Sequence, residues 1–207
     1  MARIMKEADE RKNEILDVAE SMFILKGYDS TTISDILAVM GIARGTFYYH
    51  FKSKEEVLDA IIARRGAAGV AVAEAIVDDN TLSVLEKLFK IMLAQKPGTE
   101  RDEQLVAALE NAGNAQLFQK SLTEIVLHLA PVLGRVIAQG NREGVFNMPY
   151  TQESAEILLA ALHVLFDNNE FRRLPEEMER KIVAFLAVAE RILGTTEGSL
   201  LQMTQLF

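Results

Sequence analysis

The sequence predicts an all-α protein, with an N-terminal three-helix domain that contains a helix-turn-helix and a C-terminal helical bundle, about nine helices in total. Three observations predict this fold class. Apolar residues recur at helical spacing along most of the 207 residues. Only four prolines interrupt the chain. No sustained apolar–polar alternation and no Asn-Gly or Asp-Gly dipeptide indicates a strand or a hairpin.

The first two helices carry recognisable end signals. The first is expected from about Ala8 to Lys26, because apolar residues recur at helical spacing and Gly27 follows as a C-terminal cap. Thr32 and Asp35 form a capping-box pattern that begins the second helix, with Asp in place of the usual Glu. Gly41 permits the positive φ of a tight turn and ends this helix.

A short third helix, from about Ala43 to His50, is expected to direct Phe47 and Phe51 toward the core. The second helix, the turn at Gly41 and this third helix together form a helix-turn-helix by pattern. In that motif the second of the two helices lies in the major groove of DNA, and the first lies across the backbone.

Another capping-box pattern, Ser53 with Glu56, begins a fourth helix that is expected from Lys54 to about Val77. Gly66 and Gly69 lower its helix propensity by about 1 kcal/mol each, so a break or bend is expected there. We predict a domain boundary at the start of this fourth helix. Residues 1–53 form the helix-turn-helix domain, and residues 54–207 form the effector-binding and dimerisation domain.

Five further helices are expected over residues 82–95, 100–111, 116–139, 152–167 and 176–193. Pro131 is expected to kink the third of these five. The last residues, 195–207, carry weak signals, which leaves two alternatives open: a loose segment or a docked tail.

Composition excludes several classes of site. The chain has no cysteine, which excludes disulfides and thiolate metal sites. Residues 1–10 are charged and lack the apolar region of a signal peptide, and the longest uncharged apolar run, near residues 157–166, is shorter than a membrane helix requires. A soluble, cytoplasmic protein without membrane contact, metal or cofactor is therefore expected.

The charge distribution favours a nucleic-acid partner for the N-terminal third only. The net charge is −8, yet residues 1–65 carry ten basic and eleven acidic side chains, while the remainder carries twelve and nineteen. No acidic residue occurs between Asp35 and Glu55, a stretch that contains Arg44, Lys52 and Lys54. This local basic stretch suits contact with phosphates.

The third helix has the donors that DNA recognition needs. Arg44 can pair bidentately with guanine, and Thr46 can contact a thymine methyl group. Gly45 permits close backbone approach, and tyrosine hydroxyls reach phosphates. Lys54 lies in the first turn of the fourth helix, where a helix N-terminus attracts phosphate. The residue chemistry therefore predicts DNA contact by Arg44, Gly45, Thr46, Tyr48, Tyr49, His50 and Lys54.

Four stretches carry a resemblance to a known family: GY at 27–28, TTISDI at 31–36, GIARGTFYYHF at 41–51 and SKEE at 53–56. Together they resemble the N-terminal domain of TetR-family transcriptional regulators, over roughly residues 10–60. The resemblance implies an all-helical homodimer that contacts double-stranded DNA. It adds Thr32 and Ser34 to the candidates, so the predicted DNA-binding residues are Thr32, Ser34, Arg44, Gly45, Thr46, Tyr48, Tyr49, His50 and Lys54. Ser34 stands where a basic residue is common in the family, and Leu37 and Met40 stand where alanines are usual.

Apolar stripes on the later helices are expected to be core first of all, and the same residues are candidates for a small-molecule effector site. The effector candidates are Phe89, Met92, Asn111, Phe118, His128, His163 and Phe166. Both of these histidines lie on apolar helices, which favours a core or pocket position over a metal ligand. The last two helices have wide apolar faces that suggest a dimer interface. The dimerisation candidates are Leu158, Leu162, Leu165, Ile182, Phe185 and Ala189.

Three functional hypotheses follow. The first is a ligand-responsive repressor that binds a palindromic operator as a homodimer and is released by a small, largely apolar effector. The second is a helical adaptor for protein partners, which the acidic net charge suits. The third is an enzyme that uses the C-terminal helices, against which stands the lack of a nucleophile–base pair, a glycine-rich phosphate loop or a metal cluster in the sequence.

Overall fold

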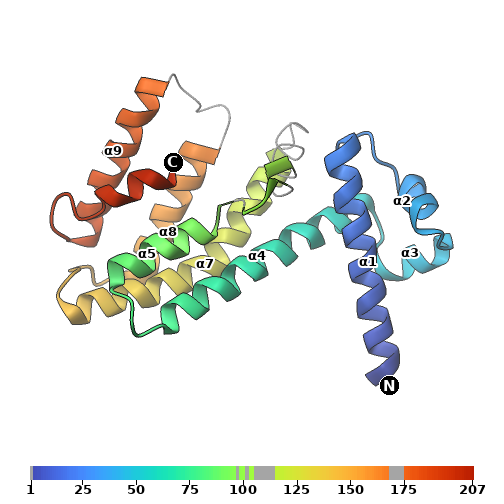
Figure 1. The fold of residues 1–207 in the computed structure, drawn as a ribbon, viewed down its shortest axis with the longest axis horizontal. Helices are drawn as coiled ribbons and strands as arrows, with labels where there is room; N and C mark the ends of the chain where they lie inside the picture. The colour runs from blue at the N-terminus through green and yellow to red at the C-terminus, as the bar shows by residue number, and fades with distance from the viewer. Residues whose placement is uncertain (1, 97, 101–102, 105–114, 168–174) are drawn as a thin grey trace. The chain divides into compact units, whose positions relative to one another are not determined.

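The described part of the chain is entirely helical. The structure is a computed structural model that describes residues 2–96, 98–100, 103–104, 115–167 and 175–207. These ranges contain eight α-helices, one π-helix and one 3-10 helix, without a strand (Figure 1). The predicted all-α class is confirmed. The predicted helix over residues 100–111 lies largely outside the described residues.

Two compact units make up the chain. Unit 1 comprises residues 1–65 and 97–120, and unit 2 comprises residues 66–96 and 121–207. The predicted boundary at residues 53/54 stays a prediction. Val57, Leu58 and Ile61, which follow that boundary, are buried in the core of unit 1.

Unit 1 contains α1 (Ala2–Lys26), α2 (Ile33–Met40), α3 (Arg44–His50) and the first part of α4 (Lys54–Asp78). α1 begins six residues before the predicted start, since no glycine or proline in that stretch ends a helix. The buried core of unit 1 is Ile15, Leu16, Ala19, Met22, Phe23, Tyr28, Ile36, Phe47, Phe51, Val57, Leu58 and Ile61.

The turn after α1 is held by a glycine and a buried threonine. Gly27 has φ of 82°, the left-handed conformation expected of a C-terminal cap. The hydroxyl of Thr31 donates to the carbonyl of Gly27 at 2.8 Å and lies 3.3 Å from the carbonyl of Met22. Thr31 thereby fixes the entry into the helix-turn-helix, a role that the sequence pattern alone did not assign to it.

Two predictions about α4 differ from the structure. Of the break or bend expected at Gly66 and Gly69, the break is absent, because the helix is continuous through both glycines. Gly69 lies against Gln95, and a Cβ at this glycine would come within 2.7 Å of the Gln95 side-chain oxygen. At the start of α4, Ser53 accepts from the amide of Glu56, but the Glu56 carboxylate accepts from the amide of Lys52, one residue earlier than in a regular capping box.

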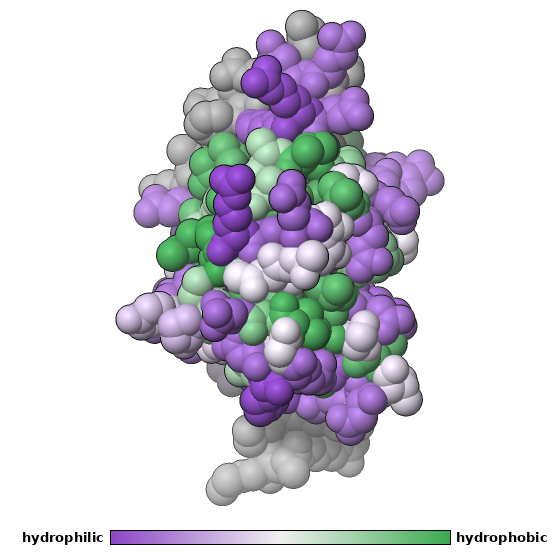
Figure 2. All heavy atoms as spheres, turned by 90° about the vertical axis from the view of Figure 1, so that its left-hand side faces the viewer, coloured by the Kyte–Doolittle hydropathy of each residue, from purple (hydrophilic) through white to green (hydrophobic). Residues whose placement is uncertain are grey.

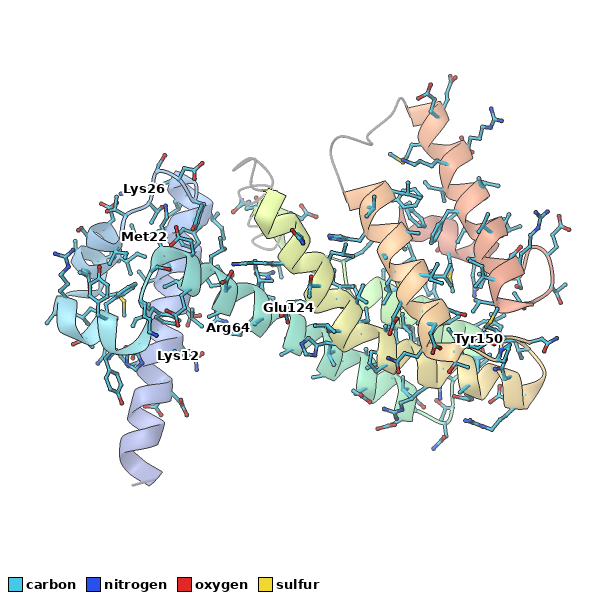
Figure 3. All side chains as sticks on the ribbon, turned by 180° about the vertical axis from the view of Figure 1, so that it is seen from behind. Lys12, Met22, Lys26, Arg64, Glu124 and Tyr150 are labelled. Atoms are coloured by element: carbon cyan, nitrogen blue, oxygen red, sulfur yellow. The ribbon has the colours of Figure 1, made fainter. Side chains whose placement is uncertain are left out.

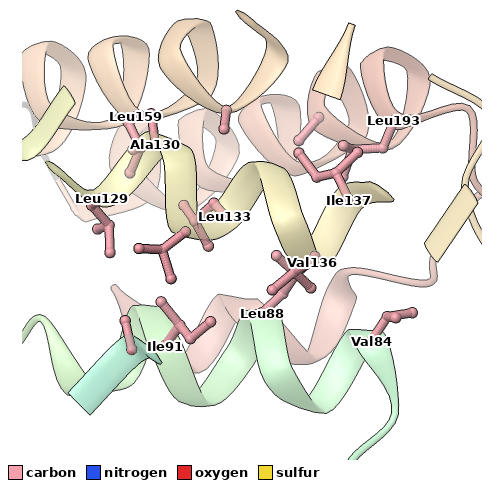
Figure 4. Packing of buried hydrophobic residues seen from close by; sticks show 14 of the residues in the cluster. Val84, Leu88, Ile91, Leu129, Ala130, Leu133, Val136, Ile137, Leu159 and Leu193 are labelled. Atoms are coloured by element: carbon pink, nitrogen blue, oxygen red, sulfur yellow. The ribbon is translucent and has the colours of Figure 1, made fainter. Parts of the chain in front are cut away.

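Unit 2 is built around residues 121–143 of α7 (Ala115–Glu143), a helix that continues through Pro131. Around it lie α5 (Val84–Ala94), α8 (Thr151–Leu162), α9 (Pro175–Leu193) and the rest of α4. Figure 4 shows how Leu133 and Val136 of α7 pack toward Leu88 of α5, and how the other side of α7 meets α8 and α9. The buried side chains of α7 lie between Leu129 and Ile137, and this stretch is apolar apart from the exposed Arg135.

This apolarity explains a second property of α7. Within the described residues, the stretch Leu122–Glu143 is long and apolar enough by composition to cross a membrane. Its buried side chains, Leu129, Leu133 and Val136 among them, belong to the core of unit 2. The composition is therefore that of a central core helix.

A buried lysine joins three helices at one end of unit 2. Lys87 on α5 is 1% exposed, and its ammonium donates to the carbonyl of Val77 on α4 at 2.7 Å and to Oε1 of Gln139 on α7 at 2.9 Å. The charge thus has hydrogen-bonding partners in the interior, as burial demands. Helical spacing of apolar residues in the sequence does not predict that this lysine is buried.

Two shorter elements complete unit 2. A π-helix, η1 (His163–Asp167), follows α8, where the sequence predicted a single α-helix to Asp167. A 3-10 helix, η3 (Leu201–Leu206), packs on α9 and α5, so the end of the chain is docked.

Candidate nucleic-acid interface

A capping box positions the start of α2. The amide of Asp35 donates to Oγ1 of Thr32 at 3.1 Å, and the amide of Thr32 donates to Oδ2 of Asp35 at 2.9 Å. The Asp35 carboxylate accepts from the amide and also from the hydroxyl of Thr32, and these two hydrogen bonds, the backbone one first, lower the pKa of the Asp35 carboxyl below its usual value, with a smaller effect from Lys26. The predicted capping box is confirmed, with Asp35 at the position that Glu usually occupies.

Gly41 forms the turn between α2 and α3. Its φ is 63°, and its amide donates to the carbonyl of Leu37 at 2.9 Å. A side chain at this position would be strained by the left-handed backbone, although no atom lies within 4 Å of its ideal Cβ. The predicted positive φ is therefore confirmed.

The inner face of α3 is held by two phenylalanines. Phe47 is 0% and Phe51 is 1% exposed, with their ring centroids 6.0 Å apart. Both belong to the core of unit 1, as the sequence predicted. The seven-residue helix is too short to be stable by itself, so this burial holds the helix in place.

The outer face of α3 presents polar and aromatic side chains to solvent. Arg44 and Gly45 are exposed, and Tyr48 and Tyr49 are 42% and 78% exposed. The guanidinium carbon of Arg44 lies 5.7 Å from the centroid of the Tyr48 ring, which orients the arginine along the helix. This cluster brings four of the nine predicted DNA-binding residues together.

The other residues on α2 and α3 are arranged around that cluster. Thr46 and His50 are half-buried, and the ring of His50 meets the ring of Tyr49 edge to face at 4.9 Å. Thr32 and Ser34 are exposed at the start of α2, where the Thr32 hydroxyl is engaged with Asp35. Ser34 has no such capping role in the box.

The Lys54 side chain contacts the loop after α1, whereas the sequence suggested a contact with phosphate. Its ammonium donates to the carbonyl of Tyr28 at 2.8 Å, lies 3.5 Å from the carbonyl of Asp29, and is 4.1 Å from the centroid of the Tyr28 ring. Lys54 thus fastens the first turn of α4 to the loop after α1. Its predicted contact with phosphate stays a prediction.

The Tyr28 ring beneath Lys54 is buried among carboxylates. Burial, followed by Glu55, Asp59 and Asp29, raises the pKa of the Tyr28 hydroxyl to about 12. Among the described residues this hydroxyl has no hydrogen-bond partner. Its ring packs edge to face on Phe23 at 5.1 Å.

A cation on α1 joins the set of candidate phosphate contacts. Lys12, labelled in Figure 3, is exposed, and its ammonium lies 5.7 Å from the ring centroid of Phe51, just beyond the end of α3. The sequence prediction omitted Lys12 because it treated α1 only as a supporting helix. The signal that was available is its spacing three residues before buried Ile15, which places it on the side of α1 that meets the core.

α1 and α4 are clamped together by ion pairs within unit 1. Glu20 is 6% exposed and accepts from Arg64 and Arg65, each at 2.9 Å. Arg64 also contacts Asp17 at 2.8 Å. These contacts fix the two helices that support α2 and α3.

The predicted effector residues separate in the structure. Phe89 and Met92 are partly buried against the core of unit 2, and His163 is 6% exposed. The expectation that His128 is a core or pocket residue is wrong, because its side chain is 59% exposed and lies 3.3 Å from Glu124, one helical turn earlier. Asn111 and the side chain of Phe118 lie outside the described residues.

Most of the predicted dimerisation residues pack against the core of unit 2. Ala189 is 4% exposed in the core, and Leu158, Ile182 and Phe185 are partly buried against it. Leu162 and Leu165 are half-buried. Leu158, Ile182, Phe185 and Ala189 therefore contribute to packing within unit 2, and the part of all six residues in a dimer stays a prediction.

Other apolar residues of α8 and α9 remain exposed. Ile157 is 59%, Val183 45% and Val188 51% exposed. On α9 the exposed positions follow helical spacing, with Ala184 and Ala187 between the two valines. Figure 2 shows apolar side chains on the face that includes α9, with polar side chains both around and among them.

No metal chemistry is suggested by this part of the protein. Within the described residues, no group of three or more His, Asp or Glu side chains has an arrangement that could hold a metal ion. The charged groups of unit 1 instead form ion pairs, helix caps and an exposed basic stretch.

Comparison with known proteins agrees with this arrangement. Residues 15–61 match the family described as bacterial regulatory proteins of the tetR family, and residues 98–188 match a tetracyclin repressor-like C-terminal domain. The chain is 35% identical over 95 residues to the HTH-type transcriptional repressor KstR2 of Mycobacterium tuberculosis (strain ATCC 25618 / H37Rv), which covers 45% of this chain and 46% of KstR2.

A second curated relative is the HTH-type transcriptional regulator AcrR of Shigella flexneri, 28% identical over 145 residues, or 69% of this chain and 61% of AcrR. The chain spans about half the length of the curated relatives it matches. Among solved structures, SmeT, the repressor of the Stenotrophomonas maltophilia multidrug efflux pump SmeDEF, shares the fold, with a TM-score of 0.60, 22% identity and coverage of 91% of this chain and 92% of SmeT.

The two family matches cover both the helix-turn-helix and the C-terminal helices, and the geometry of the cap, the turn and α3 is that of a DNA-reading motif. The family is one of regulators rather than enzymes. The chain therefore belongs to the TetR family of bacterial helix-turn-helix transcriptional regulators.

Proposed function

We propose that this protein is a ligand-responsive repressor in the cytoplasm that binds a palindromic operator as a homodimer and is released by a small, largely apolar effector. The observation that carries the proposal is the exposed cluster of Arg44, Gly45, Tyr48 and Tyr49 on the outer face of α3. Both KstR2 and SmeT are named as repressors, which supports repression over activation.

The cluster has the chemistry for two kinds of contact. Arg44 is the candidate base reader, since a guanidinium pairs bidentately with guanine in the major groove. Tyr49, which is 78% exposed, is the candidate phosphate contact. Residues 36–54 contain no carboxylate, so the sequence of α3 and its flanks adds no negative charge that would repel a phosphate.

Fluorescence anisotropy with the DNA upstream of the protein's own gene tests the proposal. Arg44→Ala should weaken operator binding by about 1–3 kcal/mol and relax the preference at one base pair. Tyr49→Phe should weaken binding to all sequences by about 1 kcal/mol. The matched control is Tyr150→Phe, a 67% exposed tyrosine in unit 2, which should leave DNA affinity unchanged.

A salt titration separates DNA binding from the adaptor hypothesis. The logarithm of DNA affinity should fall linearly with the logarithm of salt concentration, by about 0.9 for each phosphate contact. Unchanged DNA binding by the Arg44→Ala, Tyr48→Ala double variant would contradict the assignment of α3. Association with protein partners that is insensitive to salt, without any DNA binding, would favour the adaptor.

The homodimer is proposed to form through the exposed apolar stripe of α8 and α9, centred on Ile157, Val183 and Val188. Small alanines between the valines would let a second pair of helices approach closely, as in a four-helix bundle. Val188→Arg should convert the dimer to a monomer in analytical ultracentrifugation, whereas Val72→Arg, at a 48% exposed valine of α4, should not. A dimer that survives Val188→Arg would place the interface elsewhere.

The proposed release mechanism requires an effector that prefers one conformation of the protein. An effector that binds unit 2 equally well in the DNA-bound and DNA-free states shifts nothing. The proposal therefore predicts reciprocal coupling, in which operator DNA weakens effector binding by the same factor as the effector weakens DNA binding.

A further inference from the structure

The last residues of the chain form a tail that is anchored to α9. The amide of Thr195 donates to the carbonyl of Glu190 at 3.0 Å. The Glu190 carboxylate, on a residue 5% exposed, accepts from the amides of Gly198 at 3.0 Å and Leu200 at 2.8 Å. A buried carboxylate that accepts two backbone donors makes this part of the tail a fixed anchor.

The attachment weakens toward residue 207. Leu200 and Met203 are 2% and 6% exposed in the core of unit 2, and Leu206 is partly buried against it. Phe207 is 40% exposed, and its amide donates to the carbonyl of Thr204 at 3.3 Å. The tip can therefore move away while the anchor at residues 198–203 stays in place.

The ring of Phe207 completes a cluster of three aromatic rings. Its centroid lies 4.5 Å from that of Phe166 and 6.4 Å from that of Phe185. Phe166 and Phe185 themselves meet edge to face at 5.6 Å. These separations are those of favourable aromatic pairs, so two fixed phenylalanines here accept one further six-membered ring.

Phe166 lies on the π-helix η1, an irregularity that is frequent at functional sites. The irregular turn is stabilised by Lys181 of α9, whose ammonium donates to the carbonyl of Leu165 at 2.9 Å. The same ammonium lies 5.6 Å from the centroid of the Phe166 ring. A positive charge therefore stands at the edge of the aromatic cluster.

We propose that Phe166, Phe185 and Lys181 form a binding site for an aromatic carboxylic acid, and that the ring of Phe207 occupies the position of the ligand's ring in this structure. The two phenylalanines supply the aromatic walls, and the Lys181 ammonium supplies the partner for the carboxylate. The tip of the tail is then a lid that competes with the ligand. The inference rests on the proposed function only in naming this ligand as the effector.

Direct binding to the full chain, measured by isothermal titration calorimetry in the absence of DNA, tests the site. The probe is phenylacetate, and phenylacetamide is the neutral probe of similar shape. Phe207→Ala removes the competing ring and should bind phenylacetate about threefold to tenfold more tightly than the unchanged chain. Leu201→Ala, at a 52% exposed residue of the same tail, should bind like the unchanged chain.

Two further variants, made in the Phe207→Ala background, test the walls and the charge. Phe166→Ala should weaken phenylacetate binding at least tenfold. Lys181→Met should remove the preference for phenylacetate over phenylacetamide. Lys181→Arg should keep that preference, because it keeps the positive charge, and a misfolded variant would lose it. Circular dichroism melting of each variant confirms that it is folded.

Equal affinity of the Phe207→Ala variant and the unchanged chain for phenylacetate, or equal affinity of the variant for acid and amide, would overturn the proposal. A chain that binds operator DNA but not phenylacetate overturns this inference alone. A chain that binds phenylacetate but no DNA overturns the proposed function alone. Tighter phenylacetate binding by Phe207→Ala together with unchanged binding by Leu201→Ala supports the lid.

Discussion

The ammonium of Lys54 lies 4.1 Å from the centre of the Tyr28 ring and donates a 2.8 Å hydrogen bond to the carbonyl of the same residue. One side chain thus ties the start of α4 to the loop between α1 and α2. Lys54 therefore helps to hold the helix-turn-helix in place, in addition to any contact that it makes with DNA.

Lys54→Ala should therefore destabilise the protein as well as weaken DNA binding. The loss of a charge-assisted hydrogen bond and a cation–π contact should lower the free energy of unfolding by about 1–2 kcal/mol, measured in urea. Lys52→Ala, at an exposed neighbour, should lower it by less than about 0.5 kcal/mol. If Lys54 acts only as a phosphate contact, both variants will be equally stable and only the salt dependence of DNA binding will change.

Tyr28→Phe should change stability in a pH-dependent way. The folded state holds the Tyr28 proton more tightly than the unfolded state, because its pKa is raised from 10.0 to about 12. The unfolded chain therefore loses its proton first above pH 10, and the free energy of unfolding falls between pH 10 and 12, by about 1 kcal/mol at pH 11.

The phenylalanine variant lacks this contribution, so its free energy of unfolding should fall less steeply between pH 10 and 12. At pH 7 its stability should be equal to that of the unchanged chain or up to about 1 kcal/mol higher, since the buried hydroxyl has no partner among the described residues. Urea unfolding at pH 7 and at pH 11 measures the two effects. A drop of more than about 1 kcal/mol at pH 7 would show that the hydroxyl has a stabilising contact.

Gly45→Ala should separate folding from DNA binding. No atom lies within 4 Å of an ideal Cβ at Gly45, and its φ is not in the left-handed region. Alanine in a helix should therefore raise the free energy of unfolding by about 0.5–1 kcal/mol. If the glycine permits close approach of DNA, the same variant should lose operator affinity, as measured by anisotropy.

Gly66→Ala provides the control, because this glycine of α4 also has open space around its ideal Cβ. It should gain similar stability without loss of DNA affinity. Unchanged DNA binding by Gly45→Ala would mean that the backbone at this position does not approach the DNA closely.

Glu20→Gln should loosen the clamp between α1 and α4. The variant removes the charge from a carboxylate that is 6% exposed and paired with Arg64 and Arg65. The expected loss is about 2 kcal/mol in the free energy of unfolding, since a buried acceptor for two charged donors is weakened. Glu14→Gln, in an exposed pair with Arg11, should cost less than about 0.5 kcal/mol. Equal effects would indicate that the Glu20 pairs contribute no more than surface ion pairs.

Local chemistry was readable from the sequence wherever a structural feature depends on adjacent residues. Thr32 with Asp35 and the glycines at 27 and 41 mark caps and turns through backbone geometry that a few neighbouring residues decide. The inward direction of Phe47 and Phe51 followed from helical spacing in the same way. These features, together with the dense motif at residues 27–56, determined the fold class and the position of the helix-turn-helix.

The tertiary structure decided which of two apolar faces a helix buries and which polar groups lie inside. Helical spacing does not distinguish the buried Leu186 and Ala189 from the exposed Val183 and Val188, because apolar residues recur at helical spacing on both sides of α9. Lys87 is buried because carbonyls from two other helices meet at its ammonium, and the Phe207 ring reaches Phe166 across 41 positions of the chain. Such contacts arise only after packing has brought distant segments together, so no local pattern of residues encodes them.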